Sequence, residues 1–432
     1  MRHAALALLA CIGLLAQSPA PQKPLDLDTL GAQAFRAGYT LTAMAGWRDR
    51  YLKAGGAMNH FQHQREILSA FAEELYPSED TLGSTAWVEL ANGPVTLNVP
   101  ATGSRYLMLQ FVSAWAETFA IIGRKQLDGR AATLLLTPPG WTGTMPGGAR
   151  RIPCPTSIVA VSLRLFVAGE GDVAAVRNLQ DRFVFSNSPP PPRLPDSYFD
   201  ALGKLLPANP PPQLLSSVFE RLTPLGLSLD RGVDPAALDT ESRRALDAAI
   251  ALSRKDIPRP TRQARRVDGG WVVLDAGPPI PSTLEERIAR AHSGPEVFAA
   301  MPRSEALYAV GYADSNGEQL RGDRRYVVTF DPASLPPVDG FWSFTVYTAG
   351  GRPVFGARHS IRSSASYLNR TASGAIRITL GPSLPLAEQY NWLPVQPGEG
   401  VRVMLRLYQP RRAALDGSWR PPAIVPAGQA GP

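Results

Sequence analysis

A stretch at residues 80–100 constrains the fold of this chain more than any other. Apolar and polar residues alternate along it, and the alternation breaks at Asn92-Gly93-Pro94 and then resumes. Alternation with a period of two around an Asn-Gly break is typical of paired, half-buried β-strands. A β-module therefore begins here, and its polar edge is formed by Asp80, Thr81, Gly83 and Ser84.

Further strand candidates fall into two groups, which Gly- and Pro-rich turns punctuate. The first group comprises residues 86–90, 95–99, 106–112, 118–122, 133–137 and 157–167. The second comprises residues 307–312, 326–330, 341–347, 375–380 and 401–408. In the last strand Val401, Val403, Leu405 and Leu407 share one face, and Arg402, Met404, Arg406 and Tyr408 share the other. Many short strands between regular turns predict sandwiches or barrels.

Helical patterns flank the first group of strands. A helix is expected between Asp28, as its N-cap, and Gly55-Gly56, with an apolar stripe that contains Leu41 and Met44. A second helical segment is expected over Phe61–Leu75. A proline run at residues 188–195 then marks a boundary. The region beyond it is expected to hold short helices, among them residues 235–253 and 282–292.

The length of 432 residues suggests two or three structural units, at roughly 150 residues per domain. Proline (42) and glycine (38) together approach a fifth of the chain, which favours turns and short strands over long helices. The expected fold class is therefore mainly β with α. The expected divisions are residues 21–187 with the first sandwich, a helical connector at 188–304, a second sandwich at 305–426 and a tail at 427–432.

The first twenty residues have the layout of a secretory signal peptide. Arg2 and His3 precede an apolar run from Ala4 to Ala16, and small residues follow it. We expect cleavage between Ala16 and Ala20 and a periplasmic or secreted mature protein. Attachment of a lipid at Cys11 is the less favoured alternative, because the apolar run continues past it.

Net charge and hydropathy exclude two classes of partner. The formal charge is +7, but basic and acidic residues are interleaved, and no basic block contains aromatic residues. Nucleic-acid binding is therefore not expected. No later segment contains the roughly 20 apolar residues that a transmembrane helix requires. Cys154 would be the one thiol of the mature chain, and its Pro-flanked position favours a structural role.

Several motifs resemble a bacterial family with two domains of unknown function, numbers 1254 and 1214. The N-terminal resemblance covers about residues 35–185 and includes Asn59-x-Phe61-x-His63-x-Arg65, Asp80-Thr81-x-x-Ser84-x-Ala86-Trp87 and Pro139-Gly140-Trp141-x-Gly143. The C-terminal resemblance covers about 305–425 and includes Gly340-Phe341-Trp342-Ser343-Phe344-Thr345-x-Tyr347, Asn391-Trp392-Leu393-Pro394 and Leu405-Arg406-Leu407-Tyr408-x-Pro410.

The resemblance implies two jelly-roll-like β-sandwich modules joined by a helical connector, and it implies no settled activity. The chain departs from the family pattern at the polar edge of the first module. Ser78-Glu79 stands where the family usually has Asn near the Asp-Thr pair, and Gly83 stands where it usually has Tyr.

One set of residues has the composition of a catalytic triad. Ser84, His63 and Asp80 are the types required for a nucleophile, its base and an orienting carboxylate. No Gly-x-Ser-x-Gly elbow supports a hydrolase, however. The favoured alternative is that Asp80, Thr81 and Ser84 cap a turn through bonds from their side chains to the backbone.

Neither a metal nor a cofactor is expected. His60 and His63 lack the carboxylate or cysteine pair that would complete a zinc pattern. Residues 314–318 resemble part of a calcium loop, but they lack the distal Glu and are better explained as a hairpin turn.

Three functions stay open from the sequence. The leading hypothesis is binding of a small or extended ligand in a cleft between the sandwiches. Candidate contacts are Trp141, Trp115, Asn59, Arg65 and Trp87. The alternatives are a hydrolase that uses Ser84 and a structural protein that forms homo-oligomers. The distance between His63 and Ser84 discriminates between the first two.

Overall fold

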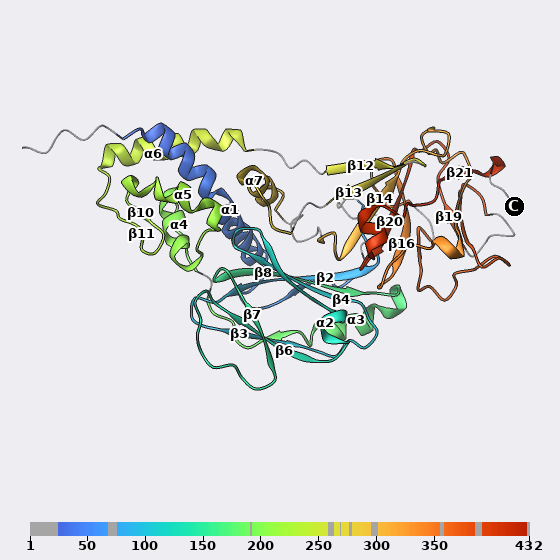
Figure 1. The fold of residues 1–432 in the computed structure, drawn as a ribbon, viewed down its shortest axis with the longest axis horizontal. Coiled ribbons are helices and arrows are strands. Elements are labelled where there is room, and N and C mark those ends of the chain that lie inside the picture. Colours follow the sequence, from blue (N-terminus) through green and yellow to red (C-terminus); the bar gives the residue numbers. More distant parts are fainter. Residues whose placement is uncertain are drawn as a thin grey trace, which may run out of the picture.

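The computed structural model describes residues 25–67, 76–190, 192–257, 263–267, 269–275, 279–294, 301–354, 358–384 and 391–429. It confirms a chain that is mainly β with α. Two β-sandwich modules lie beside each other, and a layer of helices covers part of the first (Figure 1). The expected signal peptide, with Cys11, falls outside the described residues.

Two sheets form the first sandwich. One has the strand order β1 (Gln62–His63), β2 (Thr81–Glu89), β8 (Ile158–Phe166), β4 (Leu107–Ser113) and β5 (Thr118–Gly123). The other has the order β7 (Ala149–Pro153), β6 (Ala132–Thr137), β3 (Val95–Val99) and β9 (Val184–Phe185). Alternate residues of β2, such as Leu82 and Val88, share one core with Leu97 and Leu134 of the facing sheet.

The sheet that contains β4 is buried on both faces. Every residue of β4 is buried. Its Leu109 and Phe111 point into the sandwich core, whereas Val112 packs against the helical layer and Met108 against the second module. Coverage on both faces explains why this strand is almost continuously apolar.

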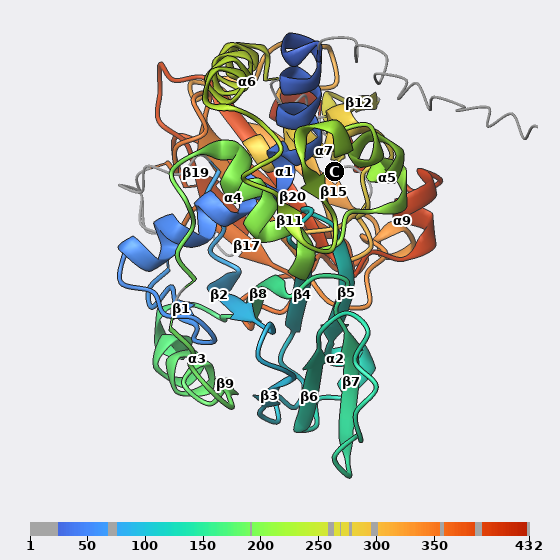
Figure 2. The ribbon, with the colours of Figure 1, turned by 90° about the vertical axis from the view of Figure 1, so that its left-hand side faces the viewer.

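The helical layer is built around α1 (Leu27–Lys53). Asp26, rather than the expected Asp28, is its N-cap and accepts a hydrogen bond from Thr29 N at 3.0 Å. α6 (Thr240–Ser253) packs closely against α1 at Gly31, where a Cβ atom would lie 2.7 Å from that of Ala249. Figure 2 shows α1, α4, α5 and α6 grouped above the first sandwich.

The remaining helical segments are short. In the described ranges, the other α-helices are α2 (Arg124–Leu127), α3 (Val173–Gln180), α4 (Tyr198–Leu205), α5 (Gln213–Glu220), α7 (Leu284–His292) and α9 (Arg412–Asp416). The 3-10 turns are η1 (Glu170–Asp172), η2 (Leu206–Ala208), η3 (Thr223–Leu225), η4 (Arg254–Asp256), η5 (Pro332–Ser334) and η7 (Ala427–Gln429). Within the described ranges, no helix has both the length and the apolar character needed to cross a bilayer.

The second sandwich also consists of two sheets. The larger has the order β12 (Gln263–Val267), β13 (Trp271–Asp275), β14 (Ala306–Gly311), β20 (Val401–Tyr408), β16 (Trp342–Thr348) and β17 (Ser360–Arg362). The smaller has the order β19 (Trp392–Pro394), β18 (Ile376–Gly381), β15 (Tyr326–Phe330) and β21 (Val425–Pro426). A separate hairpin in the connector joins β10 (Leu227–Ser228) to β11 (Gly232–Val233).

The structure differs from the expected elements at several places, among them the following. Residues 62–63, expected in a helix, form β1, because they pair with β2; residues 68–75 of that segment lie outside the described residues. β12 and β13 belong to the expected helical connector but extend the sheet of the second module through β14. Ala427, in the expected tail, donates a hydrogen bond to Arg325 O at 2.9 Å.

An aromatic cluster joins the two modules. Tyr106 of the first module meets Phe341 and Tyr408 of the second. The rings of Phe341 and Tyr408 stack with centroids 4.2 Å apart, and Tyr106 meets Tyr408 edge to face at 5.6 Å. The same face of β20 carries Arg406, so the predicted alternation along this strand directs its polar side chains toward the first module.

Candidate functional site

The structure brings together two of the three residues of the expected triad. Pairing of β1 with β2 places His63 directly opposite Ser84. Nδ1 of His63 lies 2.7 Å from Oγ of Ser84, within hydrogen-bond distance. Gln180, at the end of α3, donates from Nε2 to the same Oγ at 3.1 Å. Ser84 therefore binds side chains across the sheet and does not cap a turn.

The environment of this pair is unfavourable for a nucleophile. Ser84 is 4% exposed and is paired on both sides, with His63 on β1 and Leu163 on β8. Burial, helped by the nearby charge of Arg65, lowers the pKa of His63 to about 4. The imidazole is therefore neutral at pH 7. A base with so low a pKa is poorly matched to proton transfer at that pH.

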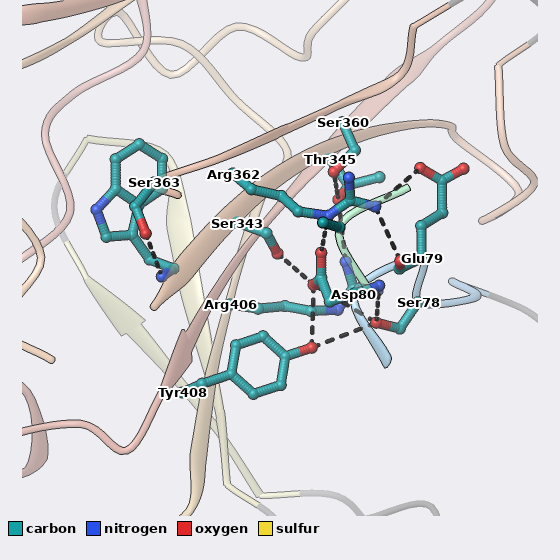
Figure 3. Close-up of polar contacts among 12 residues, drawn as sticks. Ser78, Glu79, Asp80, Ser343, Thr345, Ser360, Arg362, Ser363, Arg406 and Tyr408 are labelled. Atoms are coloured by element: carbon teal, nitrogen blue, oxygen red, sulfur yellow. Dashed lines mark hydrogen bonds and ion pairs between the residues drawn. The ribbon is translucent and has the colours of Figure 1, made fainter. Parts of the chain in front are cut away.

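The side chain of Asp80 points toward residues of the second module (Figure 3). Its Oδ1 accepts a hydrogen bond from Arg362 Nε at 3.1 Å. Its Oδ2 accepts from Ser343 Oγ at 2.5 Å and from Tyr408 OH at 3.0 Å. Because all three donors belong to the second module, Asp80 joins the modules rather than completing a triad.

Strand register explains why these donors converge. On β16, Ser343 lies opposite Arg362 of β17 and opposite Arg406 of β20, so the three form one row across the sheet. The next residue, Phe344, points into the core of the sandwich. Residues 76–80, which we call the strap, cover the polar row from outside the sheet.

Arg406 holds the other half of the strap. Its Nη2 donates to Tyr76 O at 2.9 Å and to Tyr347 OH at 2.7 Å, and its Nη1 donates to Thr345 Oγ1 at 3.1 Å. Tyr347 OH in turn donates to Pro77 O at 2.6 Å. Tyr76 adopts a left-handed backbone conformation with φ of 54°, which is unfavourable for a bulky residue and is held by these contacts.

The network buries charges that are well supplied with partners. Asp80 is fully buried and Arg406 is 2% exposed. A buried charge is costly unless opposite charges and hydrogen bonds compensate it. Here Arg362 supplies the opposite charge for Asp80, and hydroxyl and carbonyl groups satisfy the rest. Such networks rigidify the elements that they connect.

One edge of the network is partly open to solvent. Glu79 contacts His359 through its carboxylate, and its carbonyl accepts from Arg362 Nη2 at 2.8 Å. Beside them the guanidinium of Arg358 lies 4.2 Å from the ring centroid of Tyr367. We call these five residues the junction rim. It contains charged groups of both signs and one aromatic ring.

The motif Asn59-x-Phe61-x-His63-x-Arg65 closes the edge of the first sandwich. Asn59 accepts from Glu89 N at 2.8 Å and donates to Asn187 Oδ1 at 2.6 Å. The carbonyl of Arg65 accepts from Arg177 Nε at 2.6 Å. These expected ligand contacts thus tie β1 to β2 and to residues 177–187.

The three expected tryptophan contacts have different surroundings. Trp87 and Trp115 are each 1% exposed and pack in the core shared with the helices. Trp115 also donates from Nε1 to Asn209 O at 3.1 Å. Trp141 is half-buried, and Arg151 lies 5.1 Å above its ring. Trp141 is therefore the one of the three that solvent reaches.

Cys154 has no reactive features. It is 4% exposed, and burial raises the pKa of its thiol to about 12. The thiolate, which is the reactive form, is therefore negligible at neutral pH. In the part of the chain that the structure describes, no three His, Cys, Asp or Glu side chains gather as metal ligands.

Comparison with known proteins identifies both modules. Residues 58–187 match the family described as protein of unknown function (DUF1254). Residues 305–412 match the family described as protein of unknown function (DUF1214). The chain contains a DUF1254 domain followed by a DUF1214 domain. The resemblance inferred from the motifs is confirmed for both modules, in the expected order.

This DUF1254–DUF1214 protein is similar to two solved structures of bacterial proteins. The VPA0106 protein of Vibrio parahaemolyticus is 19% identical with a TM-score of 0.67, over 93% of this chain and 100% of that one. A putative uncharacterised protein of Burkholderia cenocepacia is 13% identical with a TM-score of 0.41, over 89% and 91%. The first similarity shows the fold alone. Among curated proteins, none matches the chain significantly.

Sequence reasoning missed the residues of the DUF1214 domain that bind Asp80. Arg362, Ser343 and Tyr408 were not candidates for a site. A signal was nevertheless present, because Arg406 and Tyr408 share one face of a strand whose other face is apolar. In this protein the first module covers that polar face of β20, so both side chains are buried and form polar contacts there.

Proposed function

We propose that this DUF1254–DUF1214 protein is a non-catalytic binding protein that holds a small polar ligand at the junction rim. One observation carries the proposal. Glu79 from the first module and His359 and Arg362 from the second meet at one partly exposed edge, with side chains 16%, 18% and 10% exposed. Convergent polar groups from two modules are typical of ligand sites.

The buried network beneath the rim supports this assignment. Arg362 is held by Asp80, and Glu79 is the neighbour of Asp80 in the strap. The rim is therefore ordered before any ligand arrives, which lowers the entropic cost of binding. Tyr367 and Arg358 add a stacked pair beside the charged groups. A ligand with charged or hydrogen-bonding groups and one flat face would match this set.

A ligand screen with matched variants tests the proposal. Thermal shift with amino acids, dicarboxylates and oligosaccharides would find a ligand, and calorimetry would then compare Tyr367→Ala with Trp141→Ala. We expect Tyr367→Ala to weaken binding at least about tenfold, which is 1.4 kcal/mol, and Trp141→Ala to bind like wild type. Loss of binding in Trp141→Ala alone would move the site to the first module. Equal affinities of wild type, Tyr367→Ala and Trp141→Ala for the ligand would contradict a binding site at the junction rim.

A hydrolase that uses Ser84 is the second candidate, because Ser84 Oγ and His63 Nδ1 are 2.7 Å apart. Three observations weigh against this candidate. Ser84 is buried, His63 has a low pKa, and Asp80 is bonded to Arg362 of the second module. Wild type and Ser84→Ala should be compared on ester, phosphate, sulfate and glycan substrates. A rate that disappears only in Ser84→Ala would establish the hydrolase, and equal rates would remove Ser84 from any mechanism.

We further propose that the protein is exported and acts in the periplasm or outside the cell. The basic, apolar and small-residue order of residues 1–20 supports this. Fractionation of the producing cells and the mass of the mature chain test it. A periplasmic chain that begins after residue 16 is expected, and a cytoplasmic chain that retains Met1 would contradict the proposal.

A further inference from the structure

Glu305 is a second carboxyl group buried where the modules meet. It directly precedes β14, is 9% exposed and lies beside the aromatic cluster. Its Oε2 accepts a hydrogen bond from Tyr106 OH of the first module at 3.5 Å. Tyr106 also donates toward the sulfur of Met301 at 3.7 Å. Unlike Asp80, Glu305 therefore faces mainly apolar and neutral groups.

The main cation near Glu305 is paired with another residue. Lys125 on α2 is the cation that acts on it most strongly, but Lys125 forms its ion pair with Asp339. Asp339 in turn accepts from Arg411 Nε at 2.6 Å. The other polar or titratable groups that face Glu305 or its partner Tyr106 are Gln409 after β20, Tyr308 on β14, Tyr408 on β20 and Arg164 on β8.

We propose that Glu305 is a proton-sensitive contact between the two modules. Its neutral carboxyl group allows the apolar junction to close around it. Its carboxylate accepts the Tyr106 hydrogen bond more strongly, but it loosens the junction because a buried ion must recover water. A buried carboxylate without an ion pair is costly, and hydration is the route that lowers this cost. Tyr106 also contacts Tyr408, so a looser contact between Glu305 and Tyr106 exposes this aromatic pair as well.

The backbone connects Glu305 to the strap. Gln409 N donates to Glu305 O at 2.8 Å, and Gln409 has a left-handed φ of 52° that its surroundings must hold. The preceding residue, Tyr408, donates to Asp80 in the strap. A movement of Glu305 is therefore transmitted through Gln409 and Tyr408 to Asp80, whose network supports the junction rim.

The sign of the effect follows from the burial of Glu305. Burial raises the pKa of this group to about 7, against the opposing charge of Lys125. The stabilisation by the neutral form is complete below the unfolded pKa of about 4.5 and is lost as the pH rises through about 7. Alkaline conditions thus loosen the junction, and mildly acidic conditions close it.

Denaturant unfolding between pH 4.5 and 8.5 tests the proposal with wild type, Glu305→Gln and, as a matched control, the exposed Glu399→Gln. Relative to Glu305→Gln, the folding constant of wild type should fall on the order of a hundredfold across this range. Glu399→Gln should follow wild type.

Amide hydrogen exchange gives an independent measurement of the same junction, corrected for intrinsic rates. Segments 106–108 and 341–343 should lose protection between pH 6 and 8 in wild type and keep it in Glu305→Gln. Should Glu305→Gln fold poorly, Glu305→Met offers an apolar replacement of similar length and should likewise show no dependence on pH. Identical pH profiles in wild type and these variants would overturn the proposal.

Discussion

Asp80 and Arg362 form an ion pair across the junction of the two modules, with Arg362 Nε 3.1 Å from Asp80 Oδ1. Both side chains are almost fully buried, at 1% and 10% exposure. The pair connects the residue just before β2 with the last residue of β17, 282 positions apart in the chain. The strap and the second module are therefore held as one unit, and the rim lies at the edge of this contact.

Arg406→Lys should loosen the strap although it preserves the charge. A lysine cannot reproduce the donors that reach Tyr76 O, Tyr347 OH and Thr345 Oγ1 together. We expect a loss of about 2–3 kcal/mol in the free energy of unfolding and faster proteolysis near residue 76. Denaturation and limited proteolysis measure these, with Arg402→Lys on the same strand as the control. Equal stability of the two variants would contradict the role of Arg406.

His63→Gln should change the acid stability of the first sandwich. Because burial lowers the pKa of His63 to about 4, the folded state keeps a neutral ring while the unfolded chain takes up a proton below about 6.5. Stability from this residue is present above pH 6.5 and is lost as the pH falls toward 4. Allowing for solvent screening, the loss is about 1–2 kcal/mol.

The measurement is the difference between wild type and His63→Gln in unfolding free energy from pH 4 to 7. Taking this difference removes the opposite trend that Glu305 introduces. The exposed His60→Gln is the control, and because His60 is the smallest of the influences on the pKa of His63, it should alter the pH dependence far less than His63→Gln. If the difference does not change with pH, His63 is not buried as the structure describes.

Much of the fold could be predicted from the sequence, because alternation and turn residues are patterns among neighbouring residues. Strands Val95–Val99, Tyr326–Phe330 and Val401–Tyr408 begin and end where alternation and turn residues placed them. β12 and β13 were missed, although Asp268-Gly269-Gly270 followed by Trp271–Asp275 is a hairpin signal. The proline-rich composition of the connector obscured it.

The candidate site could be predicted only in part. Residue types suggested that His63 and Ser84 belong together, and register across β1 and β2 makes them neighbours. The partners of Asp80 lie 263 to 328 residues away, and no local pattern determines such a contact. Long-range pairing between modules depends on tertiary packing, which periodicity does not contain.

Trp115→Ala should destabilise the protein without affecting ligand binding. Trp115 fills the core between β4 and the helices, meets Phe219 edge to face at 6.0 Å and donates to Asn209 O. We expect a loss of about 3–5 kcal/mol in unfolding free energy. Trp141→Ala, at a half-buried loop, should cost less than about 1 kcal/mol. Weaker binding by folded Trp115→Ala would instead indicate a ligand in the helical layer.

A double-mutant cycle with Asp80→Asn and Arg362→Gln tests the central claim most directly, namely that one buried ion pair couples the two modules. Unfolding free energies of the four proteins give the coupling, and the exposed pair Arg36–Glu285 provides the matched control cycle. We predict that each single variant loses about 3–5 kcal/mol of unfolding free energy. The coupling should be about 1–3 kcal/mol for the buried pair and less than about 1 kcal/mol for the control pair. A coupling near zero between Asp80 and Arg362 would contradict the account.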